Sequence, residues 1–244
     1  MRVRSSIIKF TVFFLVCGVS ASASPRLVIP DSTFNFGFVP RNARVSHIFW
    51  LHSLGVDTLK ILKVDPGCGC TRAPLGKSEL APGDSTALEI IFSTGYYSGW
   101  LTKHPGLLTN EGSDVRLLDF AANIVVKPDS TSPVIFEPYK FELPPFENKT
   151  RPSLNFAVRN VSGQPLEMTL VDFPPGMFKI NYPKKIKPGE SAAGKIEITK
   201  NFDGKDFAKS ITFQMNDKEK TRFTIPVTGA IRVAVPDSAG SSSK

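Results

Sequence analysis

A repeat of about 106 residues constrains most strongly what this chain can fold into. Residues 80–85 (LAPGDS) recur as residues 186–191 (IKPGES), and an alternating apolar run follows each copy. Pro fixes φ at the first turn position and Gly accepts a positive φ at the next, so each copy predicts a tight turn that leads into a strand. A repeat of this length is typical of one compact domain. The chain is therefore predicted to hold two domains built on one plan.

Other segments repeat at nearly the same offset. Residues 34–36 (FNF) match 139–141 (YKF), and residues 120–126 match 226–232. Each copy then holds about seven short alternating strands, the pattern of an immunoglobulin-like sandwich. The predicted fold class is all-β, with two tandem immunoglobulin-like β-sandwich domains after a cleaved signal peptide. By alternation Trp50 points away from the inward-facing residues beside it, so it is either an outer-face residue or a ligand contact.

The first residues predict export. Arg2, Arg4 and Lys9 precede an apolar run that ends near Val19, and residues 21–23 (ASA) form a signal-peptidase site, with cleavage after Ala23. The run is shorter than the ~20 residues that a spanning helix needs. Cys17 follows Val16 rather than a small residue, so we interpret it as an ordinary residue of the signal and not as a lipid-attachment site.

These patterns set the predicted boundaries. The signal peptide is 1–23, the first domain 25–126, a stiff Pro-containing linker 127–132, the second domain 133–235 and a disordered Ser/Gly-rich tail 236–244. Without the signal, 27 basic residues face 22 acidic ones. The lysines are dispersed and no basic stripe with interleaved aromatics occurs, so we expect no nucleic-acid partner. We also expect no membrane span in the mature chain.

An ordered set of motifs then points to a family. It comprises Phe34-x-Phe36-Gly37-x-Val39, His47-x-Phe49, Leu59-x-Ile61, Cys68-Gly69-Cys70-Thr71, Pro82-Gly83-Asp84, Gly99 and Thr109-Asn110. This set resembles the bacterial domain of unknown function numbered 1573, over about residues 30–126. The resemblance implies an exported bacterial protein with repeated immunoglobulin-like modules, related in fold to Hydin-type and major-sperm-protein-like domains, and no assigned activity. One departure is Ser53-Leu54-Gly55, where the family often has Asn-x-Gly; the second copy has Asn160 there.

Cys68 and Cys70 are the two cysteines of the predicted mature chain. Paired thiols tend to become disulfides in oxidising compartments, and Gly69 gives the backbone freedom to close so small a ring. A local disulfide, a reduced pair and a soft-metal site all remain open, because two thiolates can hold an ion such as Cu(I). His47 shares the inward face of its predicted strand, which favours a structural histidine over a ligand, and His52 and His104 have no spacing that marks them as ligands. No cofactor is expected.

A second candidate is the aromatic cluster Tyr96, Tyr97 and Trp100, which is bracketed by Gly95 and Gly99. It is either an inter-strand turn whose rings cover the edge of the sandwich or a recognition loop for a glycan or peptide. No hydrolase, metalloprotease or phosphate-loop motif occurs in the sequence, so we expect no enzymatic activity.

The leading functional hypothesis is an exported, non-enzymatic structural or interaction protein of the bacterial envelope or surface. It would act as a binding or scaffold module and sit in the periplasm or outside the cell. Its expected partner is another envelope or surface protein, and a glycan has no specific support. The alternative is a redox or copper-handling protein that works through Cys68 and Cys70. The identity of the partner, the oligomeric state and the biological process stay open.

Overall fold

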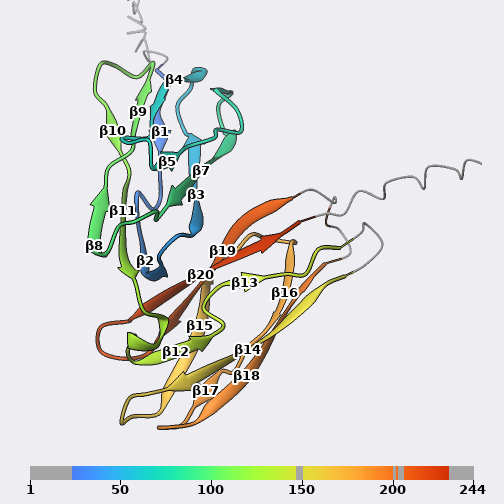
Figure 1. Cartoon of the computed structure of the whole chain (residues 1–244). Coiled ribbons are helices and arrows are strands. Elements are labelled where there is room, and N and C mark those ends of the chain that lie inside the picture. Colours follow the sequence, from blue (N-terminus) through green and yellow to red (C-terminus); the bar gives the residue numbers. More distant parts are fainter. Residues whose placement is uncertain (1–23, 147–150, 200–201, 203–205, 231–244) are drawn as a thin grey trace, which may run out of the picture.

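The computed structural model describes residues 24–146, 151–199, 202 and 206–230. The predicted signal peptide, the predicted tail and residues 231–235 of the predicted second domain lie outside the described residues. The described part is almost entirely β-structure, with one short 3-10 turn, η1 (Pro128–Ser130). We call residues 24–126 the N-terminal half and residues 127–230 the C-terminal half (Figure 1).

The N-terminal half consists of short strands in two layers. They are β1 (Leu27–Val28), β2 (Thr33–Pro40), β3 (Arg44–Ser53), β4 (Leu59–Asp65), β5 (Thr71–Arg72), β6 (Glu79–Leu80), β7 (Ser85–Ser93), β8 (Gly99–Lys103), β9 (Gly106–Thr109), β10 (Arg116–Leu117) and β11 (Asp119–Val125). One sheet has the order β1-β3-β7-β5. Opposite it lie the sheet β10-β9-β4-β6 and the run β2-β11-β8, which belongs to a larger sheet.

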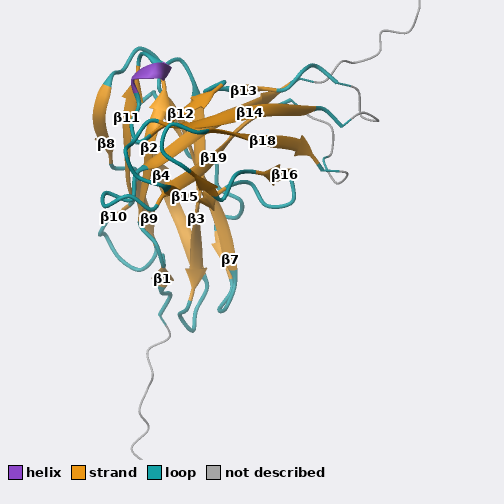
Figure 2. Ribbon diagram, turned by 90° about the horizontal axis from the view of Figure 1, so that it is seen from below, coloured by secondary structure: helices purple, strands orange, loops and turns teal. Residues whose placement is uncertain are grey.

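The C-terminal half repeats this plan. Its strands are β12 (Val134–Glu137), β13 (Phe141–Glu142), β14 (Ser153–Asn160), β15 (Leu166–Asp172), β16 (Phe178–Asn181), β17 (Lys185–Ile186), β18 (Ser191–Ile198), β19 (Phe207–Met215) and β20 (Arg222–Gly229). One sheet has the order β12-β14-β18-β16, and the other contains β17-β15-β19-β20, with β13 beside β20. In Figure 2 the strands β13, β14 and β18 run crosswise to β3 and β7 of the other half.

Alternating side chains produce two separate cores. In β7, residues alternate between buried and less buried positions along the whole strand, as expected for a sheet with one face in a core. The buried apolar residues fall into two clusters, one within residues 27–124 and one within 125–227. Both are rich in fully buried phenylalanine: Phe36, Phe49, Phe92 and Phe120 in the first, and Phe136, Phe141, Phe213 and Phe223 in the second. Large rings of this kind supply much of the apolar area that folding removes from water.

The repeat seen in the sequence extends to individual hydrogen bonds. Asn110 accepts the Lys60 N–H on its side-chain oxygen and donates its own N–H to the Lys60 carbonyl. Asn216 makes the same pair of bonds with Glu167. In each half an early strand also runs parallel to the last one, β2 beside β11 and the short β13 beside β20, with Phe34 next to Phe120 and Phe141 next to Val227. The two halves therefore share one topology.

The Pro-Gly turns have the predicted backbone. Gly83 has φ +86° and Gly189 has φ +74°, which is the left-handed region that favours glycine. Gly83 donates its N–H to the Ser53 carbonyl, and Gly189 donates to that of Asn160. Each turn thus ties the start of one strand to the end of another across the sheet.

The linker is not the only connection between the halves. Strand β2 runs parallel to β20 where Phe38 pairs with Phe223, so one eight-stranded sheet, β17-β15-β19-β20-β2-β11-β8 with β13, crosses from one half to the other. The rings of Phe38 and Phe223 lie 5.2 Å apart at this point. Sequence patterns predict strands but not this edge-to-edge pairing between the two halves.

Tyr139 offers a test of the second core. Its hydroxyl is buried and forms no hydrogen bond among the described residues, and burial raises its pKa well above the usual value. In the folded state this hydroxyl loses its hydrogen bonds to water and gains none in return. We therefore expect Tyr139→Phe to raise the free energy of unfolding slightly, by at most ~1 kcal/mol. Urea denaturation followed by circular dichroism measures the change. A loss above ~1 kcal/mol would show that the hydroxyl has a hydrogen-bond partner.

Candidate functional site

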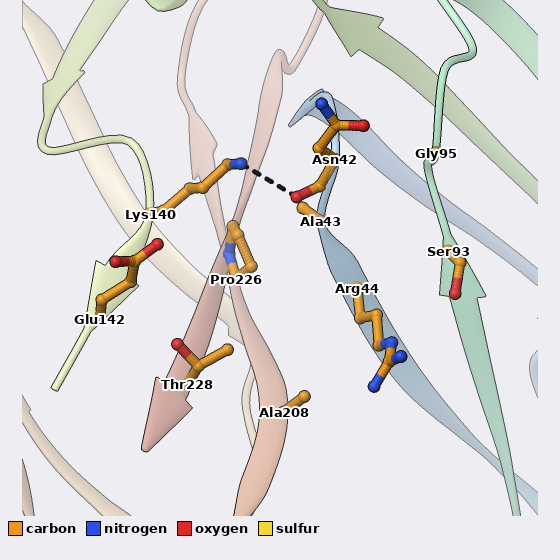
Figure 3. Close-up of a pocket in the computed structure, with 10 residues that line it drawn as sticks. All are labelled: Asn42, Ala43, Arg44, Ser93, Gly95, Lys140, Glu142, Ala208, Pro226 and Thr228. Atoms are coloured by element: carbon orange, nitrogen blue, oxygen red, sulfur yellow. Dashed lines mark hydrogen bonds between the residues drawn. The ribbon is translucent and has the colours of Figure 1, made fainter. Parts of the chain in front are cut away.

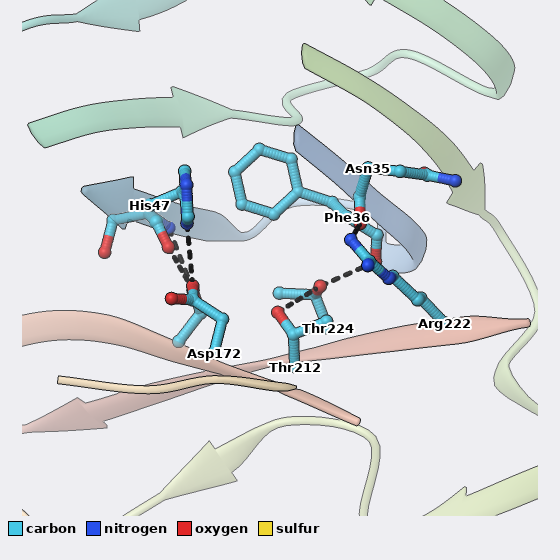
Figure 4. Close-up of polar contacts among 9 residues, drawn as sticks. Asn35, Phe36, His47, Asp172, Thr212, Arg222 and Thr224 are labelled. Carbon is cyan, nitrogen blue, oxygen red and sulfur yellow. Dashed lines mark hydrogen bonds and ion pairs between the residues drawn. The ribbon is translucent and has the colours of Figure 1, made fainter. Parts of the chain in front are cut away.

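Buried polar contacts fix the two halves against each other. The Ser210 hydroxyl accepts the Ser46 N–H and donates to the Ser46 carbonyl, both at 2.9 Å. The Thr224 hydroxyl donates to the Phe36 carbonyl at 2.6 Å (Figure 4). We call this set of contacts the junction. Its hydrogen bonds are buried, and breaking one would leave polar groups without partners away from water, so the junction should hold one relative orientation.

A half-buried pair of a histidine and a carboxylate continues the junction. His47 Nδ1 of β3 lies 3.2 Å from Asp172 Oδ2 of β15, although the His47 nitrogen does not meet hydrogen-bond geometry (Figure 4). Lys209 donates to Glu89 at 2.6 Å in a second cross-junction ion pair. Each pair joins one residue of the N-terminal half to one of the C-terminal half.

Phe34 lies at the centre of a stack. One face packs against the His47 ring, with centroids 3.6 Å apart and planes inclined by 8°. The Arg222 guanidinium lies 5.5 Å from the Phe34 centroid and donates to the Asn35 carbonyl at 3.2 Å. Burial lowers the pKa of Arg222, and the negative charge of Asp172 opposes that shift. The guanidinium is thus held by the ring, a carbonyl and a nearby carboxylate.

Beside this stack lies a crevice between the halves, which we call the junction crevice. Its volume is about 700 Å3. It is lined by Pro30, Asp31, Thr33, Phe34, His47, Ile48, Phe49, Trp50, His52, Val171, Asp172 and Arg222. Ligand pockets in proteins commonly have volumes of ~300–1,000 Å3. Trp50 remains 51% exposed, and Phe173 next to the crevice residue Asp172 is 39% exposed. The crevice therefore combines accessible apolar surface with carboxylates, imidazoles and one guanidinium.

A second cavity of about 400 Å3 lies across another part of the junction (Figure 3). Lys140 crosses it and donates to the Asn42 carbonyl at 3.0 Å. The rest of its lining is mostly small side chains and backbone, with Arg44 and Glu142 as the other charged residues. It has no aromatic residue in its lining, so the junction crevice offers the richer recognition chemistry.

Of the sequence candidates, Cys68 and Cys70 form a disulfide, with Cα atoms 5.3 Å apart. Of the three states that the sequence left open, the structure therefore has the disulfide rather than the reduced pair or the metal site. Both residues are half-buried in the loop before β5, and the Thr71 hydroxyl lies 3.4 Å from Cys68 Sγ. No group of three or more His, Cys, Asp or Glu side chains that could hold a metal ion occurs in the described ranges.

The disulfide closes a very small loop, so it should contribute little to stability. The entropy model gives about 1–2 kcal/mol for so short a ring, below the 2–5 kcal/mol typical of native disulfides in small secreted domains. We expect the double variant Cys68→Ser, Cys70→Ser to unfold cooperatively with a loss in that lower range. Urea denaturation measures it, and thiol labelling of the unfolded, non-reduced parent should find no reactive thiol. A loss above ~4 kcal/mol, or no folding, would contradict this estimate.

The aromatic cluster lies at one edge of the N-terminal half. Tyr96 is 84% exposed and Trp100, on the edge strand β8, is 64% exposed. The Arg41 guanidinium lies 5.4 Å from the Tyr96 ring, and Lys103 Nζ lies 5.3 Å from the Tyr97 ring. Tyr97 also stacks near the buried Phe92. Two of the three rings thus already have cation contacts within the chain, and a role in recognition stays a prediction.

The histidines separate in the structure. His104 Nδ1 contacts Asp119 Oδ1 at 2.6 Å on an exposed surface, whereas His47 and His52 both line the junction crevice. No sequence pattern marks Asp31, Asp172 or Arg222 as site residues. Asp172 and Arg222 come from the C-terminal half, and no periodic pattern predicts which residues of the two halves meet. The available signal was the outward position of Trp50, which the alternation predicted and the structure confirms.

Among the described residues, no helix has the length and apolar content to cross a bilayer. No curated protein matches the chain. A similar solved structure is a protein of unknown function from Porphyromonas gingivalis W83, with 14% identity, coverage of 84% of this chain and 99% of that one, and a TM-score of 0.35. The YadV chaperone is 12% identical over 83% of this chain and 98% of that one, with a TM-score of 0.30.

A third similar structure is the VesB protease of Vibrio cholerae, with 16% identity and a TM-score of 0.34. It matches 41% of this chain, and this chain covers 32% of the protease. Likenesses at these TM-scores carry no argument about activity or ligands. The family comparison is more specific, because residues 27–124 match the family described as "Protein of unknown function (DUF1573)". These residues span the first core and the motifs around Cys68 and Gly83. Residues 27–124 of this chain therefore match the DUF1573 family, as the motifs in the sequence predicted.

Proposed function

We propose that this chain is an exported, non-enzymatic interaction protein whose partner docks in the junction crevice. The observation that carries the proposal is an exposed Trp50 at a crevice built from both halves. Exposed tryptophan beside charged groups is typical of binding hot spots, which also tend to lie in preformed hollows. The buried hydrogen bonds of the junction would hold these groups in place before binding, and preorganisation reduces the entropy cost of association.

The junction chemistry favours binding over catalysis. His47 and Asp172 form a pair of the kind found in hydrolases, and Ser210 and Ser46 lie in a small hollow beside them. A nucleophilic serine must pass its proton to the histidine. Here the Ser210 hydroxyl instead donates to the Ser46 carbonyl and accepts the Ser46 N–H. The hydroxyl is thus engaged in joining the halves.

Export is supported by the N-terminal sequence pattern and by the Cys68–Cys70 disulfide, because disulfides persist mainly in oxidising compartments. The same disulfide disfavours the copper-handling alternative. Soft metal ions bind thiolates, and both sulfurs are here bonded to each other.

The test is a comparison of two tryptophan variants. The protein is immobilised, and proteins from the envelope of the cells that make it are passed over it. For the partner retained by the parent, Trp50→Ala should weaken binding at least ~10-fold, which corresponds to about 1.4 kcal/mol. Trp100→Ala is the matched control, because that ring is also exposed but lies on β8, away from the crevice. Equal binding by both variants would refute the crevice as the docking site.

A further inference from the structure

The junction crevice contains a stretch of free strand edge. In an antiparallel pair, alternate residues direct their N–H and C=O groups toward the partner strand, and those between direct them away. Along β3, Ser53 and Ala43 bond toward the β7 side, through Asp84 and Thr94. The odd-numbered residues of β3 therefore face β7. The even-numbered residues direct their backbone groups to the opposite edge.

Among the described residues, that opposite edge is paired only at its two ends. At one end, β1 pairs Val28 with His52, and Leu54 donates to the Arg26 carbonyl. At the other end, the Ser210 hydroxyl accepts the Ser46 N–H and donates to the Ser46 carbonyl. After Val28 the chain crosses to the other layer, where β2 pairs with β11 instead of β3. Between the two ends lie Ile48 and Trp50, whose outward N–H and C=O groups form no hydrogen bond with any described residue.

Ile48 and Trp50 both line the junction crevice. The free backbone groups therefore lie on the crevice side of β3. They continue the edge of β3 beyond the point where its pairing with β1 ends. An extended peptide presents N–H and C=O groups in alternation, at the spacing of a strand, so it can satisfy these backbone groups. Peptides that add to a sheet edge in this way gain affinity from main-chain hydrogen bonds. A sugar or a small ion does not present such an alternation.

We propose that the crevice takes an extended peptide segment of a partner protein, which adds as a strand to the free edge of β3. This inference rests on the proposed function and names the partner's chemistry. The segment carries at least one basic residue between apolar ones. Trp50, Ile48, Phe34 and Val171 offer apolar contacts. The charged lining consists of Asp31, Asp172 and Arg222, so carboxylates outnumber the guanidinium. Asp172 already contacts His47, whereas Asp31 is exposed and available to a basic side chain.

The probe is the peptide acetyl-Thr-Val-Lys-Val-Thr-amide, added to the 15N-labelled chain from Ser24 to Lys244. We expect saturating peptide to slow amide exchange of Ile48 and Trp50 at least fivefold, because these N–H groups become hydrogen-bonded. The amide of Ser46 is bonded already and should change little. A peptide with glutamate in place of lysine should bind several-fold more weakly. Asp31→Asn should reduce that difference, and the exposed Asp114→Asn is the matched control.

Two N-methylated peptides test strand addition itself. One is methylated at its second and fourth residues and the other at its third, so each blocks one edge of the peptide. Strand addition predicts that one loses at least tenfold in affinity and the other binds as the parent does. If both bind alike and the crevice resonances still shift, strand addition is wrong and the crevice remains a binding site.

Two other outcomes would overturn the inference. If the peptides leave the resonances of Ile48 and Trp50 unchanged, an extended basic peptide is the wrong ligand class, and the proposed function is then judged by the tryptophan variants above. If both amides are protected without peptide, and truncation after Ala230 removes that protection, the occupant is the chain's own C-terminal segment.

Discussion

Replacing Gly37 by alanine is expected to lower the free energy of unfolding by about 2–5 kcal/mol. Gly37 lies in β2, at an irregularity in its pairing with β11, and has φ +65°. A Cβ there would overlap the carbonyl oxygen of Arg222, which belongs to the backbone of β20 and cannot turn aside as a side chain can. The substitution would therefore strain β2 and push the two halves apart at the junction. Urea denaturation followed by circular dichroism measures the loss.

The control is Gly83→Ala. Gly83 also has a positive φ, +86°, but apart from its two chain neighbours no described residue has a heavy atom within 4 Å of the position a Cβ would take. Alanine there should lower the free energy of unfolding by about 1–2 kcal/mol, which is the cost of placing an L-residue in the left-handed conformation. If Gly37→Ala costs no more than Gly83→Ala, the close approach of β2 to β20 does not hold in solution.

Replacing Asn160 by alanine should have the second largest effect, a loss of about 2–3 kcal/mol. The buried Asn160 amide donates to the carbonyls of Gln164 and Ile186, at 2.8 and 3.0 Å. Its oxygen accepts the N–H and the hydroxyl of Ser162. Removing the amide leaves these groups without their partner. The loss is largest for the Ile186 carbonyl, because its hydrogen bond to Asn160 is buried and water cannot replace it. Equilibrium urea denaturation gives the value.

The repeat supplies the matched control. Ser53 occupies the equivalent place, since its carbonyl accepts the N–H of Gly83 as that of Asn160 accepts the N–H of Gly189. The Ser53 hydroxyl is buried and has no hydrogen bond among the described residues. Ser53→Ala should therefore change stability by at most ~0.5 kcal/mol. Similar losses for the two variants would mean that the side chain at this position has the same role in both halves.

Much of the fold followed from local patterns. The Pro-Gly turns predicted a positive φ at Gly83 and Gly189, and alternation placed Phe49 inside and Trp50 outside. These features depend on neighbouring residues and on the two-residue period of a strand, which a single sequence displays directly. The sequence also limited any disulfide within the predicted mature chain to Cys68 and Cys70, but it left the reduced and metal-bound states open, and the structure has the disulfide.

The junction could not be predicted in the same way. Asp172 and His47 are 125 positions apart, and each looks like an ordinary polar residue of its own strand. Their contact depends on how the two halves are oriented on each other, which small differences in surface packing decide. Gly37 carried a hint, because a glycine inside a strand often marks a bulge or a close backbone approach. The glycine alone did not indicate that the backbone of Arg222 is what approaches it.

Photo-cross-linking from position 50 is the decisive test of whether a partner protein docks in the junction crevice. A photoreactive phenylalanine analogue replaces Trp50 in the intact chain, and in a second version it replaces Trp100; both are expressed in the cells that make the protein. We predict that position 50 gives one dominant adduct with another protein, that position 100 does not, and that Asp31→Lys in the first version reduces the adduct several-fold. An adduct from position 100 but not from position 50 would contradict docking in the crevice.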